Sequence, residues 1–149
     1  MIAIGNDHTA LEMKQAVIEV LDELGLSYED CGPNTDESFD YPASGEKAAR
    51  AVAEGRCDLG IVICGTGIGI GLTANKVRGI RCAMVSEPYS ALMARRHNDA
   101  NMIAIGARVI GIEVAKLIVR TFLTEKFEGG RHARRVGMIM DVEKQETEQ

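Results

Sequence analysis

The chain alternates five short, mostly apolar runs with longer stretches in which apolar residues recur at helical spacing. Runs of Ile, Val and Ala with few polar interruptions are typical of strands that are buried on both faces of a parallel sheet. The runs cover residues 1–4, 26–31, 60–64, 80–85 and 102–105. This alternation predicts an α/β fold of three layers (αβα), in which a Rossmann-like, doubly wound parallel sheet of five strands lies between helices.

Turn and capping residues set the expected ends of the helices. Thr9 and Glu12 have the spacing of a capping box, so the first helix is expected to begin at Thr9 and to end at Gly25. Ser86 is expected to cap a later helix. Helices are expected over residues 9–24, 42–54, 86–97 and 111–124, with another near residue 72 and a helical tail from about residue 133. The length suits a single domain of residues 1–149.

Residues 60–71 change from a β-branched run to alternating glycines, and Cys64 stands at the change. A thiol at the carboxyl end of a buried strand, just before a helix, lies where backbone N–H groups and the helix dipole favour negative charge. We therefore interpret Cys64 and the loop after it as a reactive centre. The alternative is that Cys64 is a small buried residue and that the glycines only form a tight turn.

The glycine spacing does not match three common phosphate-binding motifs. It reads Gly-x-Gly-x-Gly-x-Gly, whereas a dinucleotide fingerprint needs Gly-x-Gly-x-x-Gly, and the chain has no Gly-Lys pair of the kind that ends a P-loop. A cysteine phosphatase loop would need an arginine six residues after the cysteine, where this chain has Ile70.

Composition narrows the class of protein. A net charge of -5 and only 4% aromatic residues argue against a nucleic-acid partner or an anionic membrane surface. The four cysteines form no C-x-x-C pair and no zinc-ligand spacing, nothing resembles a signal peptide, and no segment has the length of a membrane span. A reduced, cytoplasmic enzyme or binding protein is expected.

Three further groups of polar residues are candidates for function. Asp7 and His8 follow the first strand, at the edge where open α/β sheets bind ligands. His97 ends a helix, where the dipole favours its protonated form. Arg131 and Arg135 are four residues apart, which puts two guanidinium groups on one helix face and suggests a phosphate site. Each group also has a purely structural explanation. Asp7 and His8 can cap a helix start, His97 can complement the dipole at a helix end, and the two arginines can form a solvated basic turn.

Nine short segments also match the pattern of one enzyme family over nearly the whole chain. In order they are Asp7-His8, Asp40-Tyr41-Pro42, residues 63–70, Ala74-Asn75-Lys76, Gly79-Ile80-Arg81, Ser86-Glu87-Pro88-Tyr89, residues 97–101, residues 106–109 and Gly129-Gly130-Arg131-His132. The pattern resembles the ribose-5-phosphate isomerase B family, whose close relatives include galactose-6-phosphate and allose-6-phosphate isomerases.

The resemblance implies an aldose-ketose isomerase that interconverts ribose 5-phosphate and ribulose 5-phosphate through an enediolate, with no metal or organic cofactor. It implies that Cys64 is the base and that His97 opens the sugar ring, and we expect Thr66 and Asp7 to assist them. The expected substrate-binding residues are Asp7, His8, Gly65, Thr66, Gly67, Ile68, Gly69, Asn98, Arg108, Arg131 and Arg135. A homodimer, or a tetramer built from it, is expected, in which each site takes the His-Asn segment and one arginine from the neighbouring subunit.

One stretch departs from the family pattern. The family usually has small residues and an aromatic after the Asp-His pair, beside the substrate, where this chain has Thr9-Ala10-Leu11. Isomerisation of an aldohexose 6-phosphate of the allose or galactose type is therefore the alternative reaction. A non-catalytic sugar-phosphate-binding module, which would not need the thiol, and a cysteine-dependent hydrolase, which would form a covalent adduct, are alternatives of other classes.

Overall fold

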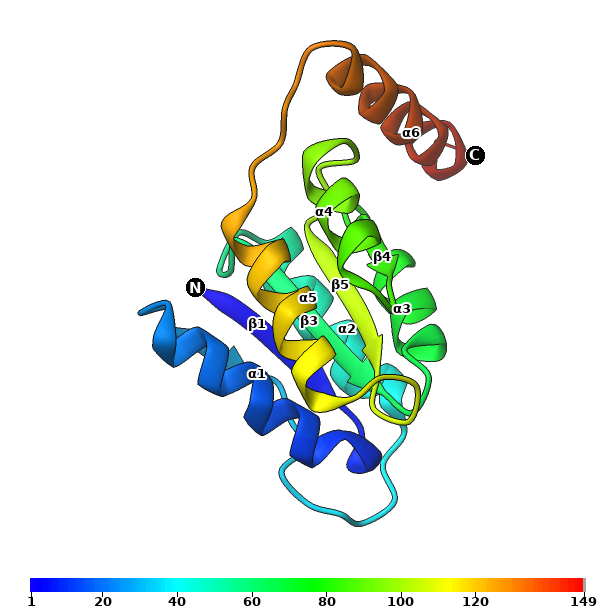
Figure 1. The fold of residues 1–149 in the computed structure, drawn as a ribbon. Coiled ribbons are helices and arrows are strands. Elements are labelled where there is room, and N and C mark those ends of the chain that lie inside the picture. The colour runs from blue at the N-terminus through cyan, green and yellow to red at the C-terminus, as the bar shows by residue number, and fades with distance from the viewer. Residues whose placement is uncertain (149) are drawn as a thin grey trace.

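The computed structural model describes residues 1–148 and shows a parallel sheet between two layers of helices (Figure 1). The sheet has the strand order β2-β1-β3-β5-β4, and each of its pairings is parallel. The predicted fold class is therefore confirmed. The strands are β1 Ile2–Asn6, β2 Tyr28–Asp30, β3 Leu59–Cys64, β4 Cys82–Met84 and β5 Met102–Gly106.

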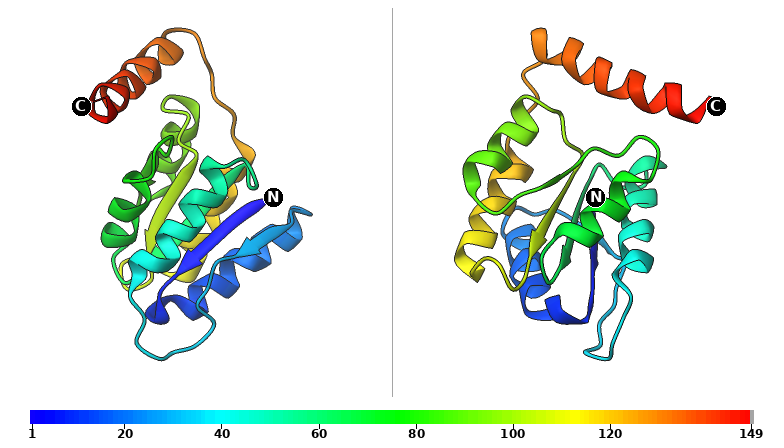
Figure 2. Two further views of the ribbon diagram at one scale, coloured as in Figure 1. Left: turned by 180° about the vertical axis from the view of Figure 1, so that it is seen from behind. Right: turned by 90° about the vertical axis from the view of Figure 1, so that its right-hand side faces the viewer.

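Each face of the sheet is covered by its own set of helices (Figure 2). One core contains Ile4 and Ile61 together with Phe122 of α5, and the other contains Ala3 and Val62 with residues of α2 and α3. The alternation arises because successive strand residues point to opposite faces. The helices are α1 Leu11–Glu23, α2 Tyr41–Ala53, α3 Ile68–Asn75, α4 Pro88–Arg96 and α5 Ile112–Thr124, followed by α6 Arg131–Thr147.

The caps predicted for two helices are wrong. Thr9 does not cap α1; instead its N–H and its hydroxyl both donate to Asp7 Oδ1, at 2.9 and 2.6 Å, and a short 3-10 helix, His8–Ala10, precedes α1. Glu87, rather than Ser86, caps α4, because its carboxylate accepts from the Ser90 N–H at 2.9 Å. In both cases a carboxylate, the stronger acceptor, replaces the hydroxyl.

The helix α3 begins at Ile68, four residues before its predicted start near residue 72. Two of the alternating glycines therefore lie inside the helix rather than in a loop. They permit close packing: a Cβ atom at Gly69 would lie 2.4 Å from Tyr41 Cζ, and one at Gly71 would lie 2.6 Å from Met84 Cγ.

The last helix, α6, lies beyond the amino ends of the strands, and an extended segment leads to it (Figure 1). The Glu143 carboxylate accepts the N–H of Gly79, at 3.1 and 3.2 Å from its two oxygens, and this contact ties α6 to the turn before β4. Gln149, the last residue of the predicted domain, lies outside the described residues. Within residues 1–148, no helix combines the length and the apolar character needed to cross a membrane.

Candidate functional site

The predicted site residues fall into two groups at opposite ends of the sheet. Arg108 follows the carboxyl end of β5, whereas Asn98 precedes its amino end, and five strand residues span about 15 Å. Figure 1 shows the same separation, since the strands all point away from α6. We call Asp7, His8, Cys64, Gly65, Thr66, Gly67, Ile68, Gly69 and Arg108 the carboxyl-end group. We call His97, Asn98, Arg131 and Arg135 the amino-end group.

Cys64 is the last residue of β3 and is buried. Its Sγ accepts a hydrogen bond from the Gly67 N–H at 3.1 Å, and Gly67 is the N-cap residue of α3. The sulfur therefore lies at a helix N-terminus with a backbone donor directed at it. Both features favour negative charge on sulfur, as a thiolate base requires.

The other three cysteines have different surroundings. Burial raises the pKa of Cys82 to about 12 and, with Glu29 close by, that of Cys31 to about 11. Burial and Glu29 also raise the pKa of Cys57. Cys31 and Cys57 donate their S–H groups to Glu29, whereas Cys64 accepts. These three thiols are protonated near neutral pH, so the arrangement singles out Cys64.

The loop after Cys64 has its shape because two backbone segments nearly touch. Gly67 has a φ of 79°, and a Cβ atom there would lie 2.8 Å from the carbonyl carbon of Ile105, so only glycine fits. The Arg108 N–H donates to the Gly65 carbonyl at 2.9 Å, which fixes the loop to the end of β5. The loop is thus fixed to the end of β5 by backbone contacts.

Thr66 precedes the N-cap residue of α3. Its hydroxyl accepts from the Ile68 N–H at 3.1 Å, while the hydrogen bond to the sulfur comes from Gly67, so a contact between Thr66 and the thiol stays a prediction. Beside the loop lies a hollow of about 260 Å³. It is lined by Thr66, Ile68, Met84, Val85, Ser86, Ala104 and Val109.

Asp7 and His8 join this loop from the end of β1. The Asp7 N–H donates to the Ile63 carbonyl at 3.1 Å, which holds β1 and β3 together at their carboxyl ends. The Phe39 N–H donates to His8 Nδ1 at 3.0 Å. An accepting Nδ1 places the proton of the neutral ring on Nε2, so His8 can donate from Nε2 to a ligand.

The side chain of Arg108 passes beside Gly65. A Cβ atom at Gly65 would lie 3.6 Å from Arg108 Cδ and 3.8 Å from Thr9 Oγ1. The structure therefore brings Arg108 close to the loop and to the segment that follows Asp7. Tyr41, the first residue of α2, packs its ring on Gly69 and so borders the same loop.

The amino-end group is built on a turn held by arginines. Asp99 has a φ of 46°, which is rare for a residue with a side chain. Its carbonyl accepts from Arg81 Nη2 at 2.7 Å, and its carboxylate accepts from Arg95 Nη1 at 3.0 Å. Arg81 Nε also donates to the Asn98 carbonyl at 3.2 Å. These bonds fix the turn that presents Asn98.

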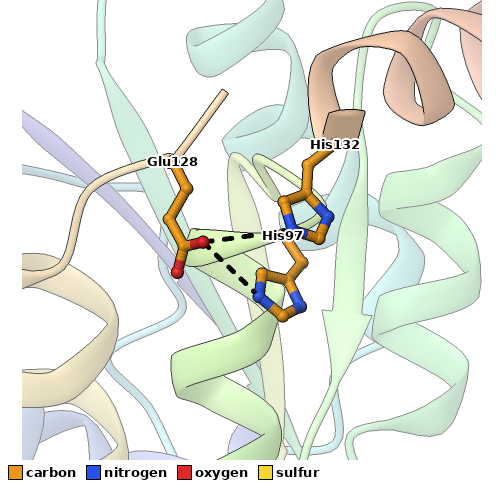
Figure 3. A group of neighbouring side chains, drawn as sticks. All are labelled: His97, Glu128 and His132. Atoms are coloured by element: carbon orange, nitrogen blue, oxygen red, sulfur yellow. Dashed lines mark ion pairs between the residues drawn. The ribbon is translucent and has the colours of Figure 1, made fainter. Parts of the chain in front are cut away.

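His97 ends α4 and stacks on His132 near the start of α6, with ring centroids 3.9 Å apart and planes 7° from parallel. Glu128 Oε2 lies 3.7 Å from His97 Nε2 and 3.9 Å from His132 Nε2 (Figure 3). This contact brings Arg131 and Arg135, on the first turns of α6, to the same end of the molecule as His97. Glu128 and His132 were not predicted as site residues, because no local pattern links them to His97.

Comparisons with known proteins cover almost the whole chain. The family model described as Ribose/Galactose Isomerase matches residues 2–139. Ribose-5-phosphate isomerase B of Escherichia coli is 47% identical over 142 residues, which are 95% of each chain. The structure of ribose-5-phosphate isomerase B from Clostridium thermocellum has a TM-score of 0.94 and 50% identity, with 97% of each chain covered. The enzyme from Mycoplasma genitalium, solved with bound ribulose-5-phosphate, has a TM-score of 0.90 and 40% identity over 96% of this chain and 95% of that one.

Proposed function

The chain belongs to the ribose/galactose isomerase family, and on that premise we propose that it interconverts ribose 5-phosphate and ribulose 5-phosphate. The observation that best supports this function is the hydrogen bond from the Gly67 N–H to Cys64 Sγ at the end of β3, because it identifies the sulfur as the candidate base. A thiolate so placed is a base at the edge of the sheet where this fold binds its ligands.

We propose that Cys64 carries the proton between the two sugar carbons. The thiolate removes the proton from C2 of the open aldehyde, and the C–H electron pair forms the C1–C2 double bond of an enediolate. The carbonyl π electrons pass to O1, which takes up the proton that the O2 hydroxyl releases. The thiol then protonates C1, the electrons of the C1–C2 double bond form the new C–H bond, and O2 becomes the carbonyl oxygen of the ketose. Negative charge on the enediolate oxygen is stabilised by backbone N–H groups of the glycine loop, with Asn98 in support.

Ring opening precedes proton transfer and requires an acid. We assign this step to His97, which protonates the ring oxygen, while the Asp7 carboxylate and the Nε2–H of His8 hold the sugar hydroxyls. Arg108, Arg131 and Arg135 bind the phosphate at the other end of the substrate. Binding energy from the phosphate aligns C1 and C2 with the sulfur.

We propose that each active site is shared between two chains. The two groups lie at opposite ends of a five-residue strand, about 15 Å apart, so one chain cannot place His97 and Cys64 on one five-carbon sugar. In a twofold dimer, the amino-end group of each chain can complete the carboxyl-end group of the other, which gives two equivalent sites. The resemblance implied one arginine from the neighbouring chain. Because Arg131 and Arg135 both lie on α6, we propose that the neighbouring chain contributes both of them to the site.

Exposed apolar side chains support this dimer. They gather beside the carboxyl-end group and on α6, where a monomer would leave them in water. The first set is Ile68, Leu72, Met84 and Val109, and the second is Met138, Ile139 and Val142. A tetramer stays a prediction. Four free cysteines fit the proposed reducing, cytoplasmic location.

The experiment that tests the function is an assay of purified protein without added metal. Ribose 5-phosphate and a panel of aldohexose 6-phosphates are compared in deuterated water. We expect efficient pentose turnover, with solvent deuterium at C1 of the ketose to the extent that the Cys64 thiol exchanges its proton before it returns it. Good hexose but poor pentose turnover would keep the chemistry and change the substrate, and binding with neither turnover nor deuterium incorporation would make the protein a non-catalytic module.

A further inference from the structure

We infer that His97, Glu128 and His132 form a binding site for a divalent transition-metal ion of the Zn²⁺ class (Figure 3). The three side chains come from the end of α4, the extended segment before α6, and the first turn of α6. Their ligand atoms all lie within 4.8 Å of one another. Figure 3 shows both imidazole rings beside the same carboxylate oxygen.

The donor set matches the chemistry of zinc rather than that of magnesium or calcium. Two imidazole nitrogens and one carboxylate oxygen are borderline ligands that Zn²⁺ binds at about 2.0–2.2 Å. Donors at that distance in a tetrahedral site lie about 3.3 Å apart. The two Nε2 atoms are now 3.7 and 3.9 Å from the shared Glu128 Oε2, so the donors must approach by about half an ångström and the stacked imidazole rings must turn out of parallel to point at one ion.

His97 and Glu128 have room to make this adjustment around the buried His132. His97 and Glu128 are about one-third and one-half exposed, and Glu128 lies in a segment without helix or strand. Three protein ligands leave the fourth position to water, which is the arrangement of an open zinc site.

Metal binding at this site has a functional consequence, which rests on the proposed role of His97. A metal bound to Nε2 occupies the lone pair of that nitrogen, so a metallated His97 no longer delivers a proton from Nε2 to the ring oxygen. The ion also joins α4 to α6. The site is therefore inhibitory: bound Zn²⁺ stops the opening of the ribose 5-phosphate ring and leaves Cys64 untouched.

Direct binding tests the site without reference to activity. Zn²⁺ is titrated into the wild-type protein, His132→Ala and Glu128→Gln in competition with a chromophoric chelator, and His8→Ala serves as the matched histidine control. We expect one ion per chain in the wild type. His132→Ala and Glu128→Gln should each lose at least about tenfold in affinity for Zn²⁺, because removal of even a residue that only hydrogen-bonds a metal ligand costs about that much. Unchanged affinity in both variants, or an equal loss in His8→Ala, would overturn the site.

A thiolate site at Cys64 is the rival explanation, and Co²⁺ as the probe separates the two. Ligation by His97, Glu128 and His132 gives visible cobalt bands without a sulfur-to-cobalt charge-transfer band, and the spectrum is the same in Cys64→Ala. A charge-transfer band that disappears in Cys64→Ala would contradict the proposal.

Activity measurements then test the inhibition. Zn²⁺ is expected to reduce ribose 5-phosphate turnover reversibly, with recovery on addition of chelator, and the inhibitory concentration should rise at least about tenfold in Glu128→Gln relative to wild type. Inhibition with equal potency in both proteins would refute the inhibitory role. Zinc binding in a protein that converts no sugar phosphate would leave the metal site standing and would remove the proposed function instead.

Discussion

The two halves of the candidate site are built by different means. The carboxyl-end group is held by backbone: Gly67 turns the loop, and its N–H holds the Cys64 sulfur in the buried end of the sheet. The amino-end group is held by side chains, since Arg81 and Arg95 fix the turn at Asp99 on the protein surface. The first half is built around a buried sulfur, whereas the second lies on the surface of the chain.

This difference assigns different chemistry to the two halves. A buried thiol beside a loop of backbone N–H donors suits proton removal from carbon and stabilisation of an enediolate. An exposed set of imidazole and guanidinium groups suits binding of phosphate and protonation of a ring oxygen. Each prediction below changes one half and leaves the other intact.

The largest effect is expected when each half loses its proton-transfer group. Cys64→Ala should lower turnover by about 10²- to 10⁴-fold, and it should also abolish exchange of the C1 hydrogen of ribulose 5-phosphate with solvent. His97→Ala should lose ribose 5-phosphate turnover but retain that exchange, because ribulose 5-phosphate has no free 5-hydroxyl and is already open. Proton magnetic resonance in deuterated water measures both. Cys82→Ala is the control for loss of a thiol. Loss of exchange in His97→Ala would show that His97 also takes part in proton transfer at carbon, and would contradict the separate roles.

A smaller effect is expected from the phosphate-binding arginines. Arg135→Ala should raise the Michaelis constant for ribose 5-phosphate by about 10- to 100-fold, since a hydrogen bond to a charged group contributes about 1.5–3 kcal/mol. Arg134→Ala, one residue earlier on the same helix, is the matched control and should leave the constant near that of the wild type. Equal changes in the two variants would show that only the general charge of α6 matters. Steady-state kinetics at fixed ionic strength measures the difference.

The backbone construction of the catalytic loop predicts a difference between two glycines with similar dihedral angles. Gly67 and Gly79 have φ values of 79° and 90°, but a Cβ atom at Gly67 would lie 2.8 Å from backbone, whereas nothing lies within 4 Å of one at Gly79. Gly79→Ala should therefore cost about 1–2 kcal/mol of stability, and Gly67→Ala should cost about 1 kcal/mol more and lower kcat. Urea unfolding measures both. Equal stability losses would mean that Ile105 does not constrain the loop.

The smallest effect is expected at the arginine-held turn. Asp99→Asn keeps a residue that tolerates positive φ but removes the charge that faces Arg81 and Arg95. Because this ion pair is partly exposed, the loss of stability should be below about 1 kcal/mol. Chemical unfolding checks this value, and a loss of several kcal/mol would show that the carboxylate, rather than the carbonyl bonds, holds the turn.

Sequence patterns predicted the layers, because buried parallel strands and helix-breaking glycines leave local signals. Gly25, for example, is expected to end the first helix, and it has a φ value of 68° just after α1. The start of α3 was placed too late, because Gly69 looks like a loop residue until Tyr41 is seen against it. Helix caps were misassigned because several residues near each helix start can accept the same N–H.

The candidate site was predicted only as a set of residues. That His97 and Cys64 lie at opposite ends of the sheet follows from the strand directions, but the stacking of His97 on His132 depends on where α6 lies. No local signal in the chain fixes that position. Glu128 could not be found for the same reason, since its two partners are distant from each other in sequence.

The most direct test of the shared site is complementation between inactive subunits. Cys64→Ala and His97→Ala proteins are mixed in equal amounts under conditions of proven subunit exchange, and ribose 5-phosphate turnover is measured. A shared site predicts recovery of about a quarter of the wild-type activity, because half of the dimers are then mixed and each mixed dimer has one intact site. Complete exchange without any recovery of activity would contradict the account, because it would place Cys64 and His97 of the same chain in one site.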